Sequence, residues 1–145
     1  MLHGYGPALL QGLLSTLTVA ACSLATACAF GLLGATMKLS RSPLARGAAT
    51  AYTTLIRGLP ELVLMLMIFY GGQILLNRVA DAQGWGYIDV PPFAAGVLTI
   101  GFIFGAYLTE TFRGAILAIP KGQSEAALAF GMTRAQVLRR IVLPQ

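Results

Sequence analysis

Charged residues are scarce in this sequence. They make up 10 % of its 145 residues, whereas apolar residues make up 57 % and the mean hydropathy is +0.75. An average soluble domain carries roughly 25 % charged residues, so a soluble globule of this length would lack the polar surface that it needs. A disordered chain is excluded as well, because disorder accompanies low hydrophobicity and high charge. The composition therefore predicts an integral membrane protein.

Residues suited to catalysis or metal binding are also few. The sequence has two cysteines, Cys22 and Cys28, in an uncharged stretch, and one histidine, His3, near the N-terminus. Such cysteines act as small apolar residues, so we expect neither a disulfide nor a metal site. There is no G-x-x-x-x-G-K-[ST] phosphate loop, no His-Glu-x-x-His motif and no pair of carboxylates placed to hold metal ions on one helical face. We therefore expect a non-catalytic chain without cofactor or metal.

Three long runs with almost no charge are present. The expected membrane spans are residues 9–37, 59–77 and 90–110, each close to or above the roughly 20 apolar residues that cross a bilayer as a helix. A cleaved signal peptide would need a positive N-terminal region and a shorter apolar core, and the first run has neither. The sequence thus predicts an all-α membrane protein with three transmembrane helices.

Basic residues are distributed unevenly between these spans. Of the ten Lys and Arg residues, only Arg78 lies between the second and third spans. The positive-inside rule places the other nine in the cytoplasm, so the N-terminus and the loop at 77–89 lie outside. Trp85 and Tyr87 in that loop are typical membrane-interface residues. The net charge of +5 thus indicates topology and contact with membrane lipid, and no nucleic-acid partner is expected.

Small residues at a spacing of four occur in two spans. The first span has Ala21, Ala25 and Ala29, and the third has Gly101 and Gly105. Small residues at this spacing let helix backbones approach closely in lipid. Both sets are therefore predicted to lie at helix–helix contacts.

The segment after the third span has helix start and stop signals. Pro120 can open a helix, and Gly131 suits the left-handed residue that ends one. Thr133 and Gln136 form a capping-box pattern for a second helix. In this second helix Val137, Leu138, Ile141 and Val142 recur at helical spacing, and Arg134, Arg139 and Arg140 lie largely off that stripe.

Two interpretations of this tail remain open. An interfacial helix on anionic lipid accounts for the arginines of the second helix. The first helix, rich in alanine with one glutamate, would bind lipid weakly and is better suited to a groove on a protein.

The tail resembles the EAA loop of ABC importer permeases. The matching residues are Glu125, Ala126, Ala127 and Gly131, followed by 141–144, Ile-Val-Leu-Pro. The resemblance implies that the four named residues form a coupling helix and its turn, which dock on an ATP-binding cassette subunit. It also implies a second permease subunit, a periplasmic substrate-binding protein and ATP hydrolysis by a separate subunit.

Two further stretches resemble the polar amino-acid branch of this family. Residues 52–62 resemble the opening of its second span, and residues 105–114 the end of its third. The likeness is greatest to permeases of importers for histidine, lysine, arginine and ornithine, which implies a multi-pass protein of the bacterial inner membrane.

The family has two more spans after the Leu-Pro that stands here at 143–144. The chain is thus expected to be the N-terminal part of a type I importer fold, with a coupling loop at 114–145. By itself it is not expected to transport.

Two intramembrane carboxylates have competing interpretations. Glu61 lies in the first turn of the second span, where it either favours the positive helix end or meets a cationic substrate. Glu110 precedes Arg113 by three residues, which predicts a structural ion pair on one helical face. The expected function is a permease subunit for basic polar amino acids, and the alternative is a small membrane scaffold whose basic tail recruits a partner.

Overall fold

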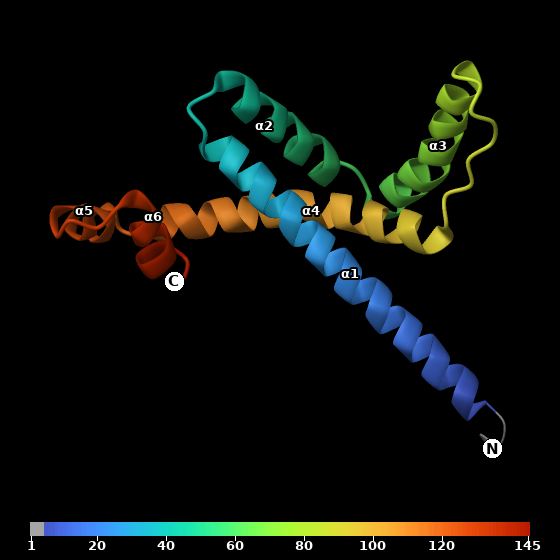
Figure 1. Ribbon diagram of the computed structural model, residues 1–145, viewed down its shortest axis with the longest axis horizontal. Helices are drawn as coiled ribbons and strands as arrows, with labels where there is room; N and C mark the ends of the chain where they lie inside the picture. The colour runs from blue at the N-terminus through green and yellow to red at the C-terminus, as the bar shows by residue number, and fades with distance from the viewer. Residues whose placement is uncertain (1–4) are drawn as a thin grey trace.

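The computed structural model describes residues 5–145, and this part of the chain contains helices and no strand (Figure 1). His3 lies outside the described residues. The helices are α1 (Gly6–Leu39), α2 (Pro43–Arg57), α3 (Glu61–Ala82), α4 (Pro92–Ala118), α5 (Lys121–Ala129) and α6 (Arg134–Val137), followed by the π-helical turn η1 (Leu138–Val142). The predicted all-α fold is therefore confirmed.

Three helices are long and apolar enough to cross a membrane. They are α1, α3 and α4, with 34, 22 and 27 residues. Each overlaps one of the spans expected from the sequence and continues past that span's C-terminal end. In Figure 1, α1 crosses α4, and the N-terminal half of α1 extends away from the other helices. Side chains 5–18 of that half are all exposed.

The crossing of α1 and α4 depends on small residues. A Cβ atom added to Gly105 would lie 2.6 Å from the Cβ of Phe30, and one added to Gly101 would lie 2.6 Å from the Cβ of Thr26. The expected role of this glycine pair in helix packing is therefore found within the chain, where the absence of a side chain lets two backbones approach.

The predicted alanine stripe of α1 does not take part in this crossing. Ala21, Ala25 and Ala29 are exposed in the structure, so they do not form the contact with α4. The buried residues of α1 are Ser23, Ala27, Gly31, Gly34 and Ala35. This buried row begins at Ser23, two residues after Ala21. Because two residues correspond to about half a turn of an α-helix, the buried row lies roughly opposite the alanine stripe. Both rows consist of small residues at near-helical spacing, so the spacing alone did not show which row contacts α4.

Helix α2 was not expected from the sequence. The hydroxyl of Ser42 accepts a hydrogen bond from the backbone N–H of Ala45, and Pro43 occupies the first turn, which together form a strong helix start. Its buried residues are Ala49, Thr53 and Ile56, at a spacing of four and three. A search for uncharged runs overlooks such a helix, because the evidence for it is an amphipathic period.

Tyr52 fastens α2 to α4. Its hydroxyl donates a hydrogen bond to the backbone carbonyl of Phe102 at 2.5 Å, and the two rings lie 4.9 Å apart. Burial raises the pKa of the Tyr52 phenol to about 12, so the hydroxyl remains protonated and can donate throughout the physiological range. This contact holds α2 where it can support the ends of α1 and α4.

Two amide side chains of α3 hold the loop that leads to α4. Gln73 donates to the carbonyl of Ile88 at 2.5 Å and accepts from the N–H of Val90 at 3.2 Å. Asn77 accepts from the N–H of Ile88 at 2.8 Å. Trp85 and Tyr87 remain exposed beyond this anchor, as side chains at a membrane interface would.

Candidate functional site

The end of α5 has the geometry that the sequence predicted. Gly131 has φ +84°, in the left-handed region. Its N–H donates to the carbonyl of Leu128 at 3.0 Å, and the N–H of Met132 donates to the carbonyl of Ala127 at 3.1 Å. These two bonds form a Schellman motif. The chain therefore reverses sharply at a residue whose conformation is accessible mainly to glycine.

The next helix starts at once. The backbone N–H of Gln136 donates to the hydroxyl of Thr133, and the Gln136 side chain accepts from the N–H of Thr133 at 2.8 Å, which completes the predicted capping box. Val137 is buried, whereas Leu138 is exposed. The helix passes into a π-helical turn, closed by a hydrogen bond of 2.9 Å from the N–H of Leu143 to the carbonyl of Leu138. This wider turn shifts the helical phase, so the expected apolar stripe is only partly buried.

The four residues predicted to contact an ATPase subunit differ in exposure. Glu125, Ala126 and Gly131 are exposed, whereas Ala127 is buried at 7 % exposure. Phe130, next to the turn, is 88 % exposed. Helix α5 lies beyond the C-terminal end of α4 (Figure 1). This part of the chain thus exposes the carboxylate of Glu125 and the ring of Phe130, whereas Ala127 is buried.

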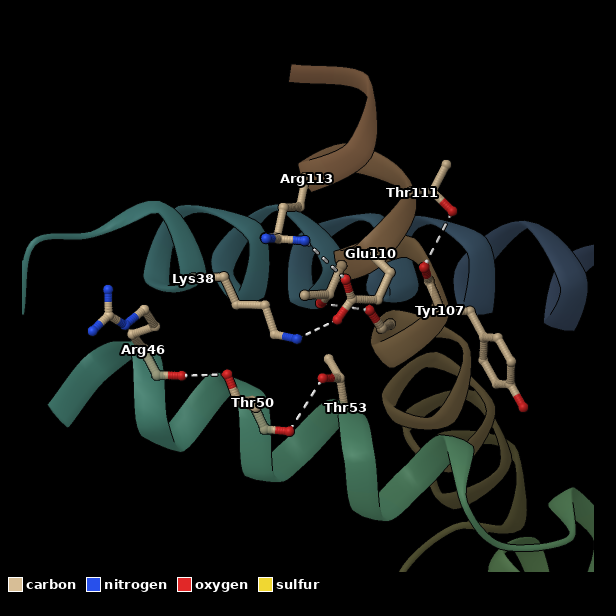
Figure 2. A network of polar contacts seen from close by, with 10 residues as sticks. Lys38, Arg46, Thr50, Thr53, Tyr107, Glu110, Thr111 and Arg113 are labelled. Carbon is tan, nitrogen blue, oxygen red and sulfur yellow. Dashed lines mark hydrogen bonds and ion pairs between the residues drawn. The ribbon is translucent and has the colours of Figure 1, made fainter. Parts of the chain in front are cut away.

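A second polar site joins the ends of α1 and α4 (Figure 2). The ammonium group of Lys38 forms an ion pair with the carboxylate of Glu110, and its side chain is only 9 % exposed. The Arg113 guanidinium lies 3.6 Å from the other carboxylate oxygen. Glu110 and Arg113 therefore do lie together, but Lys38 is the nearer and more buried partner. Thr53 of α2 lies beside them.

Glu61 lies apart from this cluster. It begins α3 and is exposed, and no side chain caps this helix end. Four residues earlier, at the end of α2, the guanidinium of Arg57 lies over the ring of Tyr107 from α4, 5.5 Å from the ring centroid. The sequence gave no indication that Arg57 would contact Tyr107, because these two residues lie on different helices.

The ion pair between Lys38 and Glu110 could have been predicted from the sequence. It ends the first span, and Glu110 ends the third. Two spans separated by one other span run in the same direction, so opposite charges near their C-terminal ends lie at one depth. Because an unpaired charge at membrane depth is costly, these two residues were natural partners.

A protein-family model matches a segment that includes α5 and the Gly131 turn. It is the model for binding-protein-dependent transport system inner membrane components, and it matches residues 27–145, which is most of the chain. The chain belongs to this family. The resemblance to ABC importer permeases is thereby confirmed, since the family's defining region includes α5 and the Gly131 turn.

Relatives within the family are transport permeases. The chain is 57 % identical to the histidine/lysine/arginine/ornithine transport system permease protein HisQ of Escherichia coli, a match that covers 99 % of this chain and 63 % of the relative. It is 45 % identical to the nopaline transport system permease protein NocQ of Agrobacterium fabrum, covering 98 % of this chain and 61 % of the relative. The chain thus spans less than two thirds of the length of either relative.

A solved structure has the same fold. It is the crystal structure of an amino acid ABC transporter with histidines, which matches 97 % of this chain and 61 % of that chain with a TM-score of 0.74 and 33 % sequence identity. The fold is therefore that of an ABC amino acid transporter permease, as the resemblance implied, although α2 was not expected.

Proposed function

We propose that this chain is part of a permease subunit that forms half of the membrane pathway of an ATP-driven importer. The observation that carries the proposal is the α5–Gly131 turn, an exposed short helix that follows α4 and ends in a turn closed by two backbone hydrogen bonds, directly before the capping box that starts α6. Such a helix suits insertion into a groove on another protein. Its partner is an ATP-binding cassette subunit, which hydrolyses ATP, so this chain itself is not a catalyst.

The remaining partners complete an importer. A second permease subunit forms the other half of the pathway, and a periplasmic substrate-binding protein delivers the substrate. The distribution of basic residues supports an inner-membrane topology with the N-terminus in the periplasm and the coupling loop in the cytoplasm.

The substrates are proposed to be basic amino acids. HisQ, at 57 % identity, belongs to a histidine/lysine/arginine/ornithine transport system. The exposed carboxylate of Glu61 supports the same class, because a cationic side chain passing through an apolar channel needs a counter-charge. We therefore propose that Glu61 belongs to the substrate pathway and that Glu110 and Arg113 have a structural role.

A membrane scaffold that only recruits a partner is the weaker alternative. The basic tail was the feature that supported this alternative. That tail lies within residues 27–145, which match a transport family, so the family match favours the permease. The two functions differ in what the tail binds, because a permease loop binds an ATPase and a lipid-bound tail does not need one.

Co-purification of the ATPase subunit tests the proposal. In the full-length permease, Glu125→Lys reverses an exposed charge on α5, and we expect recovery of the ATPase to fall at least about tenfold, as for a lost charge-assisted contact. Asp89→Lys makes the same charge change in the exposed loop before α4 and should leave recovery unchanged. Equal recovery from both variants, or tail binding that depends on anionic lipid alone, would refute the docking of α5.

A further inference from the structure

The C-terminal half of α1 is packed tightly against α4. A Cβ atom added to Gly31 would lie 2.6 Å from the Cβ of Leu108, and one added to Gly34 would overlap the side chain of Thr109. The two backbones therefore approach closely over this stretch. Close-packed contacts have low compressibility and transmit displacement from one element to the next. We therefore expect a movement of this part of α4 to be shared by α1.

An ion pair extends this contact to the C-terminal end of α1. Lys38, in the last turn of α1, contacts the carboxylate of Glu110 directly, and its side chain is 9 % exposed. Figure 2 shows the two side chains pointing toward one another between the helices. Separating a pair buried to this degree is costly, because each charge would remain buried without compensation. The pair therefore resists movements that draw the end of α1 away from α4.

Helix α2 is attached to the same part of α4. The hydroxyl of Tyr52 donates a hydrogen bond to a backbone carbonyl of α4. Ile56 of α2 is buried in one apolar cluster with Ile103 and Ala106 of α4. The short connection 40–42 joins α2 to the end of α1, and these two helices also contact each other. Helices α1, α2 and α4 therefore form one packed body.

Glu110 also lies close to the helix that is proposed to dock on the ATPase. Helix α4 continues unbroken from Glu110 to Ala118, a rise of about 12 Å. Residues 119–120 then lead directly into α5, which lies beyond the end of α4 (Figure 1). A movement of α5 therefore reaches α4 at the end that carries the ion pair.

We propose that the Lys38–Glu110 pair couples movement of α5 to the packed body of α1, α2 and α4, so that these three helices move together when the partner hydrolyses ATP. Lys38 is thus a positioning residue, which acts through Glu110 and α4. Without the pair, the end of α4 separates from α1, and movement of α5 is absorbed by local distortion. The inference rests on the proposed transport function and goes beyond stabilisation, since it predicts lost coupling in protein that remains assembled.

The amount of arginine accumulated per ATP hydrolysed tests this inference. This coupling ratio is measured in proteoliposomes made from purified, assembled transporter that contains the full-length permease, with the substrate-binding protein outside. We expect Lys38→Gln to hydrolyse ATP within about twofold of the wild-type rate and to lower the ratio at least about fivefold, the lower end of typical coupling between sites. Unfolded permease is removed with the unassembled fraction, so reduced stability alone does not lower the ratio.

Two further substitutions serve as controls. Lys38→Arg keeps a cation that can pair with Glu110, and it should keep the coupling ratio within about twofold of wild type. Arg46→Gln makes the same charge change as Lys38→Gln at an exposed position on α2, and it should leave the ratio unchanged. An unchanged ratio with Lys38→Gln, or an equal loss with Arg46→Gln, would overturn the inference.

A covalent bridge provides a second test, which also covers the case in which Lys38→Gln does not assemble. The variant Lys38→Cys/Glu110→Cys, in a permease otherwise free of cysteine, removes both charges together, which is better tolerated than removing one. A short bifunctional thiol reagent then joins the two positions. We expect a low ratio before bridging and at least about half of the wild-type ratio afterwards.

The bridge also gives a clear opposing result. If the ends of α1 and α4 must separate during transport, the bridged protein will not accumulate arginine, and this outcome would overturn the inference. A wild-type ratio before bridging would overturn it as well. In either case, ATP-driven uptake by the wild-type protein would leave the transport function standing, whereas wild-type vesicles that accumulate no arginine would refute that function itself.

Discussion

A full-length permease carrying Lys38→Met is expected to lose stability and to unfold at a clearly lower temperature in detergent. Lys38 joins the end of α1 to Glu110 of α4, with side chains 9 % and 24 % exposed. Removing one partner of a buried ion pair costs about 3–5 kcal/mol because the other charge remains buried without compensation. We expect the lower end of this range, since Arg113 still lies 3.6 Å from the carboxylate.

The double variant Lys38→Met/Glu110→Met is the control for this prediction. Replacing both charges by apolar groups of similar volume is often neutral, so the double variant should recover most of the lost thermal stability. The measurement is the midpoint temperature of the loss of monodisperse protein in size-exclusion chromatography. An unchanged midpoint for the single variant, or a double variant as unstable as the single one, would contradict the role given to this pair.

The local features of the tail could be predicted from sequence because they depend on a few neighbouring residues. Gly131 adopts the expected left-handed conformation, and Thr133 and Gln136 form the expected capping box. Both features require only a turn of chain and the side chains within it. The three apolar helices were likewise identifiable, because length and hydropathy alone define a candidate span.

Features that depend on contacts between distant segments were harder to predict. The stripe of Ala21, Ala25 and Ala29 does not contact α4 within this chain, because spacing does not say which face of α1 meets α4. The Arg57–Tyr107 contact joins residues 50 positions apart on different helices. Lys38 was counted only as a charge that sets topology, although its own partner lies on α4.

Gly131→Val is expected to reduce transport by at least about tenfold. Gly131 has φ +84°, and an L-residue in the left-handed region costs roughly 1–2 kcal/mol, more for a β-branched side chain. The strain would displace α5 from the position in which it meets the ATPase subunit. The measurement is the rate of ATP-driven uptake by the reconstituted transporter, at equal amounts of permease.

Gly131→Asn is the matched variant, because asparagine tolerates the left-handed conformation better than other residues with a side chain. It adds atoms to a position with open space around it, so it should retain much of the transport rate. Equal losses from valine and asparagine would indicate that bulk rather than backbone conformation matters at the turn. No loss from valine would contradict the role of the turn in coupling.

The central claim is that this chain contributes to a membrane pathway driven by ATP hydrolysis on a partner docked at α5. Its most direct test is uptake of radiolabelled arginine into proteoliposomes that contain the full-length permease, its companion permease and the ATPase, with the substrate-binding protein outside. We predict accumulation that requires ATP inside the vesicles and falls at least about tenfold with Glu125→Lys. Uptake that proceeds without ATP, or that is unaffected by Glu125→Lys, would contradict the claim.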